Sequence, residues 1–165
     1  DNGITNYDLL YRVISMCKQH NIPVLINNRV DLLLEMDFDG IHFDDIPSTW
    51  KTIKEVLKHK YIGITCTNDL RIVEWATAQQ VDYISFCSIF ESKNNSSCDL
   101  VDFKNILRAR EISTIPFILA GGITLENIDT LAPLDYQAVA MISGIMSAQE
   151  PQQKINTLYK KINNG

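Results

Sequence analysis

The stretch IPFILAGGITLENIDTL, residues 115–131, decides how the chain is interpreted, because a buried strand there ends on two adjacent glycines. Gly121 and Gly122 precede a helix-like segment that Thr124 is placed to cap. Glycines permit a tight turn. They also leave backbone N–H groups accessible to a phosphate, because no Cβ shields them. The rest of the sequence has to distinguish a turn from a phosphate cradle.

Strand-like and helix-like segments alternate along the whole sequence. The strand-like segments are residues 23–28, 40–43, 61–66, 83–90, 116–122 and 138–145. The helix-like segments are residues 7–20, 29–36, 49–59, 69–80, 100–110, 125–132 and 151–162. The strands are almost continuously apolar, which is typical of parallel strands buried on both faces. The helices are amphipathic, and one apolar stripe is predicted at Leu9, Leu10, Val13, Ile14 and Cys17.

This order predicts an α/β fold, either a doubly wound sheet or a (β/α)8 TIM barrel. Polar and glycine residues follow many strand ends, which favours the barrel, because barrel enzymes build their sites from several ends at once. A full barrel has eight strands in about 250 residues. We therefore predict that residues 1–165 form a single barrel domain, with one to two N-terminal strand–helix units absent from the given chain. A free-standing six-stranded domain is the weaker alternative.

Composition limits the classes of function. The 165 residues carry a net charge of −5, with 45% hydrophobic and 21% charged residues. An acidic balance argues against nucleic-acid binding, although a few backbone donors suffice for a small anion. No apolar run approaches the roughly 20 residues that span a bilayer, so no membrane association is predicted. The first ten residues do not resemble a signal peptide.

Cysteine usage predicts a reducing compartment and hence a cytoplasmic location. The four cysteines, Cys17, Cys66, Cys87 and Cys98, show no metal-binding spacing, and no disulfide is expected. Cys66 and Cys87 fall inside predicted strands, where we interpret both as small core residues.

Three segments carry a family resemblance: PVLINNRVDLLLEMDFDGIHF (23–43), YIGITCTNDLRIVEWATAQQVDYISFCSIF (61–90) and IPFILAGGITLENIDTLAPLDYQAVAMISGI (115–145). Together they resemble the thiamin phosphate synthase/TenI family of (β/α)8 barrels. The resemblance implies an enzyme that joins an aminopyrimidine methyl diphosphate to thiazole phosphate and releases pyrophosphate with Mg²⁺ as cofactor. The expected partners are therefore small phosphorylated substrates.

The resemblance also assigns the glycine pair a role. The thiazole-phosphate nest would consist of Gly121, Gly122 and the backbone around Ile142 and Ser143. The N-termini of the following helices would add partial positive charge. The alternative is a turn that strand-to-helix geometry requires.

The implied metal and diphosphate positions diverge from the family pattern. Asn27 matches and would contact the pyrimidine, whereas Asn28 replaces a Mg²⁺-binding aspartate. The second metal aspartate falls near Asp45. Asp44 and Asp45 together are compatible with a bound cation, with a solvated loop or with a helix cap before residues 47–50.

The loop ESKNNSS, residues 91–97, takes the place of the family's diphosphate-binding segment. Ser92 and Asn94 would donate hydrogen bonds to the diphosphate, while Asn95 stands where the family has a lysine. A mobile polar loop is the alternative.

Two residues are candidates for catalysis. Thr65 keeps the hydroxyl of a family serine, and His42 ends a strand, where a packed core histidine is the alternative. The aromatizing TenI members use a histidine that this sequence replaces with Thr67, which cannot shuttle a proton near neutral pH.

The preferred interpretation is a TenI-type protein of thiamin biosynthesis that resembles thiamin phosphate synthase. A thiazole phosphate tautomerase and a non-catalytic binder of thiazole or thiamin phosphate are the alternatives, followed by a sugar-phosphate isomerase. A homo-oligomer through the apolar helix at residues 50–57 also stays open.

Overall fold

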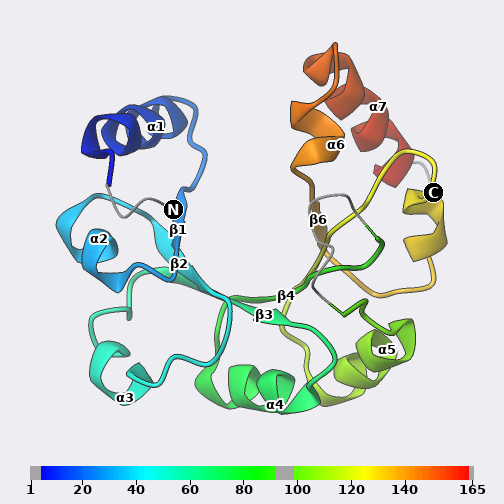
Figure 1. The fold of residues 1–165 in the computed structure, drawn as a ribbon. Helices are drawn as coiled ribbons and strands as arrows, with labels where there is room; N and C mark the ends of the chain where they lie inside the picture. Colours follow the sequence, from blue (N-terminus) through cyan, green and yellow to red (C-terminus); the bar gives the residue numbers. More distant parts are fainter. Residues whose placement is uncertain (1–4, 92–98, 164–165) are drawn as a thin grey trace. The chain divides into compact units, whose positions relative to one another are not determined.

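The computed structural model describes residues 5–91 and 99–163 (Figure 1). The chain forms two compact units, residues 1–64 and residues 65–165, each of which is described separately. The first unit contains α1 (Tyr7–Gln19), β1 (Leu25–Asn27), α2 (Val30–Glu35), β2 (Gly40–Phe43) and α3 (Trp50–Ile53). It ends within β3 (Tyr61–Cys66), which continues into the second unit.

In the first unit, β2 pairs in parallel with both β1 and β3. Asn27 is level with His42, and His42 is level with Gly63, so the carboxyl ends of β1 and β2 meet at one edge. Ile41 and Phe43 are buried on one face, and the ring of Phe43 meets that of Trp50 edge-on at 6.5 Å. His42 belongs to the other face, since side chains alternate along a strand.

The first helix only partly confirms the predicted apolar stripe. Asn6 caps α1 by accepting a hydrogen bond from the N–H of Leu9. Ile14 is buried, whereas Leu9 is 52% and Val13 is 42% exposed. Leu9 and Val13 therefore belong to the predicted apolar stripe without being buried in the structure described.

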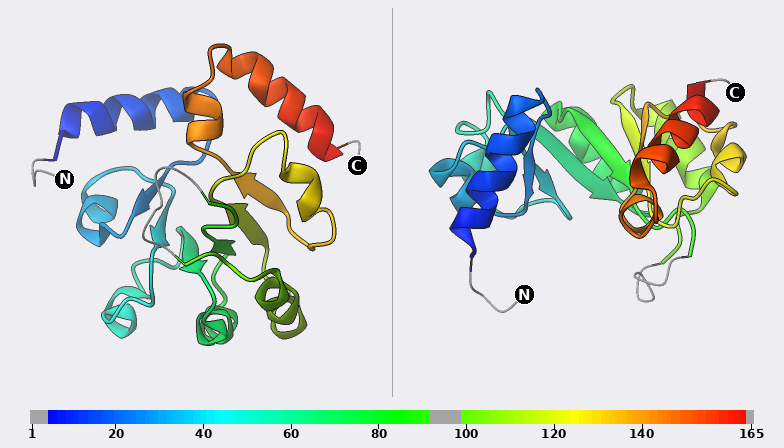
Figure 2. Two further views of the ribbon diagram at one scale, coloured as in Figure 1. Left: turned by 45° about the vertical axis from the view of Figure 1, so that its right-hand side comes forward. Right: turned by 90° about the horizontal axis from the view of Figure 1, so that it is seen from above.

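The second unit repeats the strand–helix order. Its elements are α4 (Leu70–Gln79), β4 (Tyr83–Phe86), α5 (Phe103–Ile112), β5 (Phe117–Ala120), the 3₁₀ helix η1 (Ile128–Leu131), β6 (Ala138–Ala140), α6 (Ser143–Met146) and α7 (Pro151–Asn163). β5 pairs in parallel with both β4 and β6. α4 and α5 lie side by side, and α6 contacts α7, which Figure 2 shows from two sides.

The two faces of the β4–β5–β6 sheet differ in chemistry. On one face Ile84, Phe86, Phe117 and Leu119 are fully buried, and the rings of Phe86 and Phe117 meet at 5.0 Å. Helices α4 and α5 add the buried side chains Val73, Ala76, Ile106 and Ala109. The other face carries Ile118 together with side chains that are small or polar, namely Tyr83, Ser85, Ala120, Ala138 and Ala140. The first face forms the core, and the second is available to line a site.

The structure corrects several predicted boundaries. The strand predicted at 83–90 stops at Phe86, shortly before Ser88, which adopts a left-handed φ of 70°. The strand predicted at 138–145 stops at Ala140, because α6 begins at Ser143. The helix predicted at 49–59 is regular only from Trp50 to Ile53, and that predicted at 125–132 is the four-residue η1.

The parallel α/β fold is confirmed. Closure into a (β/α)8 barrel and a single domain over residues 1–165 stay predictions. Within residues 5–91 and 99–163, no helix combines the length and apolarity needed to cross a bilayer.

Candidate functional site

Gly121 and Gly122 occupy positions where only glycine fits. Their φ angles are 92° and 65°, in the left-handed region that side chains disfavour. A Cβ on Gly121 would lie 2.6 Å from the backbone nitrogen of Ser88. A Cβ on Gly122 would lie 2.5 Å from the carbonyl oxygen of Phe90. The turn interpretation therefore accounts for both glycines by itself, and a cradle needs independent support.

A cavity of about 220 Å³ beside the glycine pair supplies that support. It is lined by residues at or just after the ends of β4, β5 and β6: Cys87, Ser88, Ala120, Gly121, Gly122, Ile123, Ala140, Met141, Ile142, Ser143 and Gly144. The predicted nest residues after β5 and after β6 thus line one cavity. They are brought together because parallel strands present their carboxyl ends at the same edge of a sheet.

Three of the residues that line this cavity have backbone N–H groups without a partner among the described residues. Among the residues that the structure describes, none accepts a hydrogen bond from the N–H of Gly122, Ser143 or Gly144. The two loops are close, since a Cβ on Gly144 would lie 3.2 Å from the carbonyl oxygen of Ile123. Backbone N–H groups need an acceptor, and an oxyanion provides several at once. The arrangement suits a phosphate.

Short helical elements follow both loops that line this cavity, so a helix contribution to anion binding stays a prediction. After Gly122 the chain forms a loop and then only the four-residue η1, which starts at Ile128. α6 also has four residues. Such short elements sum few peptide dipoles, so we expect anion binding here to depend mainly on individual N–H groups.

Asn127 holds the glycine loop in shape. Its side-chain Nδ2 donates to the carbonyl oxygen of Gly122 at 2.9 Å, and its Oδ1 accepts from the N–H of Thr124 at 2.8 Å. Thr124 in turn accepts from the N–H of Glu126 at 3.2 Å, so it caps a turn and not a helix. The sequence analysis missed Asn127. The sequence feature that could have revealed its role is its position three residues after Thr124, the predicted cap.

Thr65 does not line the cavity itself but contacts Cys87, which does. The Thr65 hydroxyl oxygen lies 3.7 Å and that of Ser85 3.5 Å from the Cys87 sulfur. Cys87 follows β4, is half-buried and lines the cavity, so its prediction as a core strand residue is wrong. Cys66 is a core residue as predicted, and burial, followed by the charge of Asp69, raises the pKa of its thiol to about 12.

The predicted metal position in the first unit is closed by amides. The side-chain Nδ2 groups of Asn27 and Asn28 both donate to Asp44 Oδ2, at 3.1 Å and 2.6 Å. The N–H of Asp44 donates back to Asn28 Oδ1 at 3.0 Å. Asn28 has a φ of 58°, and its own N–H donates to the carbonyl oxygen of His42 at 2.9 Å. One oxygen of the Asp44 carboxylate thus accepts hydrogen bonds from two neutral amides.

These donors do not fit Mg²⁺, which prefers hard, anionic oxygen ligands. The amide N–H groups of Asn27 and Asn28 both donate to one Asp44 oxygen, Oδ2, and supply no anionic ligand of their own. Asp45 Oδ1 accepts from the N–H of Ile46 at 2.7 Å. Throughout residues 5–91 and 99–163, no three His, Cys, Asp or Glu side chains are grouped to hold a metal. The cap alternative is also wrong, since Thr49 is the N-cap of α3.

Of the remaining candidates, the structure describes His42 but not Ser92 or Asn94. His42 is half-buried, and burial lowers the pKa of its imidazole, with the Asp44 charge acting in the opposite direction. The side chain is therefore neutral at neutral pH. Ser92 and Asn94 lie outside the described residues, so their contact with a diphosphate stays a prediction.

Comparison with known proteins identifies the family. The model of the family described as thiamine monophosphate synthase matches residues 4–145. The chain belongs to the thiamine monophosphate synthase family. The match covers most of the sequence and confirms the resemblance found in its motifs.

Curated members of the thiamine monophosphate synthase family are similar over most of this chain. A thiamine-phosphate synthase from Prochlorococcus marinus is 32% identical over 152 residues, which are 90% of this chain and 43% of the relative. One from Anoxybacillus flavithermus is 29% identical over 164 residues, 97% of this chain and 74% of the relative. The chain thus spans less than half of the first relative and about three quarters of the second.

A solved structure shares the fold. The thiamine phosphate pyrophosphorylase from Pyrococcus furiosus superimposes with a TM-score of 0.81 at 20% sequence identity, covering 98% of this chain and 80% of the solved chain. At this identity the likeness concerns the fold alone.

Proposed function

We propose that this protein binds thiazole phosphate, with the phosphate group in the cavity between the loops after β5 and β6. One observation carries the proposal. The cavity is lined by Gly122, Ser143 and Gly144, whose N–H groups donate to none of the described residues. A phosphate oxygen accepts such bonds readily, and glycine lets it approach the backbone.

The reaction that fits this ligand is the one performed by the family's synthases. The bond between the pyrimidine methylene carbon and the diphosphate oxygen breaks, and pyrophosphate leaves with the electron pair. The thiazole nitrogen then forms a new bond to that carbon. The cavity would hold the thiazole phosphate in place, so that the thiazole nitrogen reacts with the pyrimidine carbocation before water does. Asn27, Ser92 and Asn94 stay the proposed contacts to the pyrimidine diphosphate.

A binding protein without turnover is the second candidate. It is favoured by the group of Asn27, Asn28 and Asp44, which we call the Asp44 cluster. The amides of Asn27 and Asn28 hold the Asp44 carboxylate in a closed set of hydrogen bonds. A synthase that uses Mg²⁺ would need an open carboxylate in this region. A thiazole tautomerase is less well supported, because Thr67 replaces the histidine that such enzymes use.

Calorimetry followed by a turnover assay tests the proposal. Thiazole phosphate is titrated into the full chain, with inorganic phosphate and unphosphorylated thiazole alcohol as comparison ligands. We expect the phosphorylated thiazole to bind at least tenfold more tightly than the alcohol. The absence of binding by both phosphates would refute the proposal. Pyrophosphate release with the pyrimidine diphosphate then distinguishes a synthase from a binder.

A further inference from the structure

The cavity continues from the glycine loop onto a floor of three small side chains. Ala120 of β5 is level with Ala140 of β6. Cys87 directly follows Phe86, which is level with Leu119, and so comes level with Ala120. All three residues line the cavity. We define Cys87, Ala120 and Ala140 as the cavity floor.

The chemistry of the floor differs from that of the glycine loop. The glycine loop presents backbone N–H groups, whereas the floor presents two methyl groups and one thiol. An ionic phosphate gains nothing from methyl groups, while a flat ring of low polarity loses water by packing against them. Sulfur is polarizable and makes favourable contacts with aromatic rings. The cavity thus has one end for an anion and another for a small ring.

We infer that the ring of the phosphorylated ligand lies on this floor and that Cys87 determines which ring fits. The inference rests on the proposed function and specifies its ligand as a small heteroaromatic phosphate. Cys87 has the longest side chain of the three floor residues. The hydroxyl oxygens of Thr65 and Ser85 lie 3.7 Å and 3.5 Å from its sulfur, so these two directions are occupied. Because Cys87 also lines the cavity, we expect a larger side chain at this position to take up cavity volume.

A pair of substitutions tests this inference. Cys87→Leu increases the side-chain volume on the cavity floor. Cys87→Ala is the matched control, because it changes the same position without adding volume. In Cys87→Leu we expect the affinity for thiazole phosphate to fall about tenfold or more, since one methylene in a tight pocket is worth that much. Its affinity for inorganic phosphate should stay within about threefold, because the glycine loop is untouched. Cys87→Ala removes the sulfur contact without adding volume, so its affinity for thiazole phosphate should fall less than that of Cys87→Leu.

Thiol labelling of the unmodified protein provides a second test that does not depend on a variant folding. Iodoacetamide is added with or without saturating thiazole phosphate, and mass spectrometry locates the modified cysteines. We expect the ligand to slow labelling of Cys87 and to leave labelling of the half-buried Cys17 on α1 unchanged. Cys66 should stay unlabelled in both samples, since its pKa of about 12 keeps it a thiol.

The outcomes separate this inference from the proposed function. If neither phosphate ligand binds the unmodified protein, the proposed function is wrong. If thiazole phosphate binds, but Cys87 is labelled at the same rate with and without it, the ring lies elsewhere and the inference alone is overturned. Equal losses for both phosphates in a folded Cys87→Leu variant would overturn it as well.

Discussion

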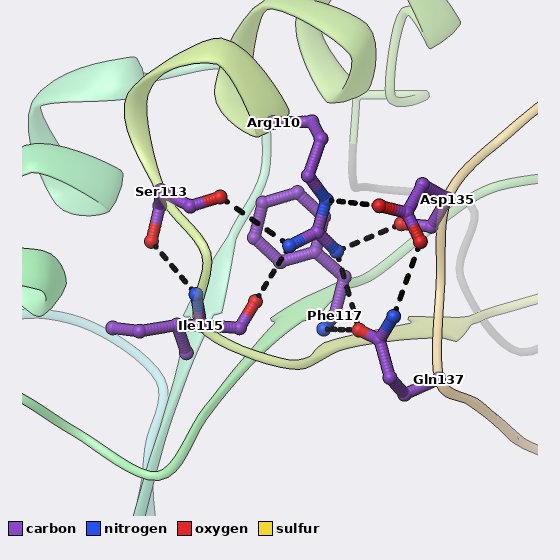
Figure 3. A network of polar contacts seen from close by, with 6 residues as sticks. All are labelled: Arg110, Ser113, Ile115, Phe117, Asp135 and Gln137. Carbon is purple, nitrogen blue, oxygen red and sulfur yellow. Dashed lines mark hydrogen bonds and ion pairs between the residues drawn. The ribbon is translucent and has the colours of Figure 1, made fainter.

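The guanidinium of Arg110 lies over the ring of Phe117, with 3.7 Å between its central carbon and the ring centroid (Figure 3). The same group donates hydrogen bonds to the carbonyl oxygens of Ser113, Ile115 and Asp135. It also donates to Gln137 Oε1, which accepts from the N–H of Phe117 at 2.8 Å. One side chain of α5 therefore ties together the segments that enter β5 and β6.

Replacing Arg110 with lysine should destabilise the fold. Lysine keeps the charge but loses the planar fork, so several carbonyl oxygens lose their donor. We expect the free energy of unfolding to fall by about 2 kcal/mol, measured by urea denaturation. The matched control is Arg71→Lys, whose side chain is 86% exposed and pairs with Asp69. That change should leave the free energy of unfolding close to that of the unchanged protein, because a solvent-exposed ion pair contributes little. If both substitutions lowered the free energy of unfolding equally, the hydrogen bonds of Arg110 would not contribute to stability as we propose.

Gly122→Ala should impair both folding stability and phosphate binding. The added Cβ would lie 2.5 Å from the Phe90 carbonyl oxygen, and alanine disfavours the φ of 65°. We expect a loss of more than about 1 kcal/mol in unfolding free energy, together with loss of phosphate binding in calorimetry.

Gly144→Ala is the companion variant, since Gly144 also lines the cavity. Its Cβ would meet the flexible end of Met141 at 2.9 Å, and the nearest backbone atom lies at 3.2 Å. We expect a smaller loss of stability than for Gly122→Ala, measured in the same denaturation series. Greater destabilisation by Gly144→Ala would show that the two loops are not packed as described.

Strands with strong sequence signals were predicted to the residue. The segments 40–43 and 61–66 are mostly apolar and are bounded by polar residues, and β2 and β3 have those bounds. The run 138–145 is equally apolar, but it contains the break between β6 and α6. An apolar run does not reveal such a break, because buried strand and buried helix have the same composition.

The candidate site was predictable where backbone geometry determines it. Gly121, Gly122 and Ser143 follow strand ends, and parallel strands bring such ends together. Asn127 and Cys87 escaped prediction because their roles depend on contacts that local sequence does not specify. The Asp44 cluster shows the same limit, since its amide partners lie 16 and 17 positions away in the sequence.

Asn28→Asp should create a metal site where the present residues do not fit one. The amide nitrogen of Asn28 lies 2.6 Å from Asp44 Oδ2, so a carboxylate in its place would face another carboxylate. Without metal, their repulsion should lower the melting temperature. Added Mn²⁺ or Mg²⁺ should restore it, because paired carboxylates bind hard cations.

Thermal unfolding with and without each cation measures this effect. The unchanged protein serves as the reference, and its melting temperature should not respond to the cations at this cluster. Asp45→Asn is the control, since the Asp45 side chain bonds to its own neighbour Ile46. If the unchanged protein gained stability from Mg²⁺ and Asp45→Asn abolished that gain, our interpretation of the cluster would be wrong.

His42 should make stability depend on pH in the weakly acidic range. Burial lowers the pKa of its imidazole below the ordinary value of 6.5, while Asp44 raises it less. Between these two pKa values the unfolded chain binds more protons than the folded protein, so acidification favours unfolding. The contribution of His42 is fully present above pH 6.5 and is lost as pH falls through the lowered pKa.

Urea denaturation from pH 7.5 to pH 5 should therefore show a decline that His42→Gln reduces, by up to about 1.4 kcal/mol for each unit of pKa shift. His59→Gln is the matched control, because His59 is exposed in the segment after α3. Only the His42 variant should flatten the profile, since only there does protonation place a charge in a half-buried site. Parallel profiles for the unchanged protein and His42→Gln would mean that the imidazole is solvated, and His42 would then face open water at the end of β2.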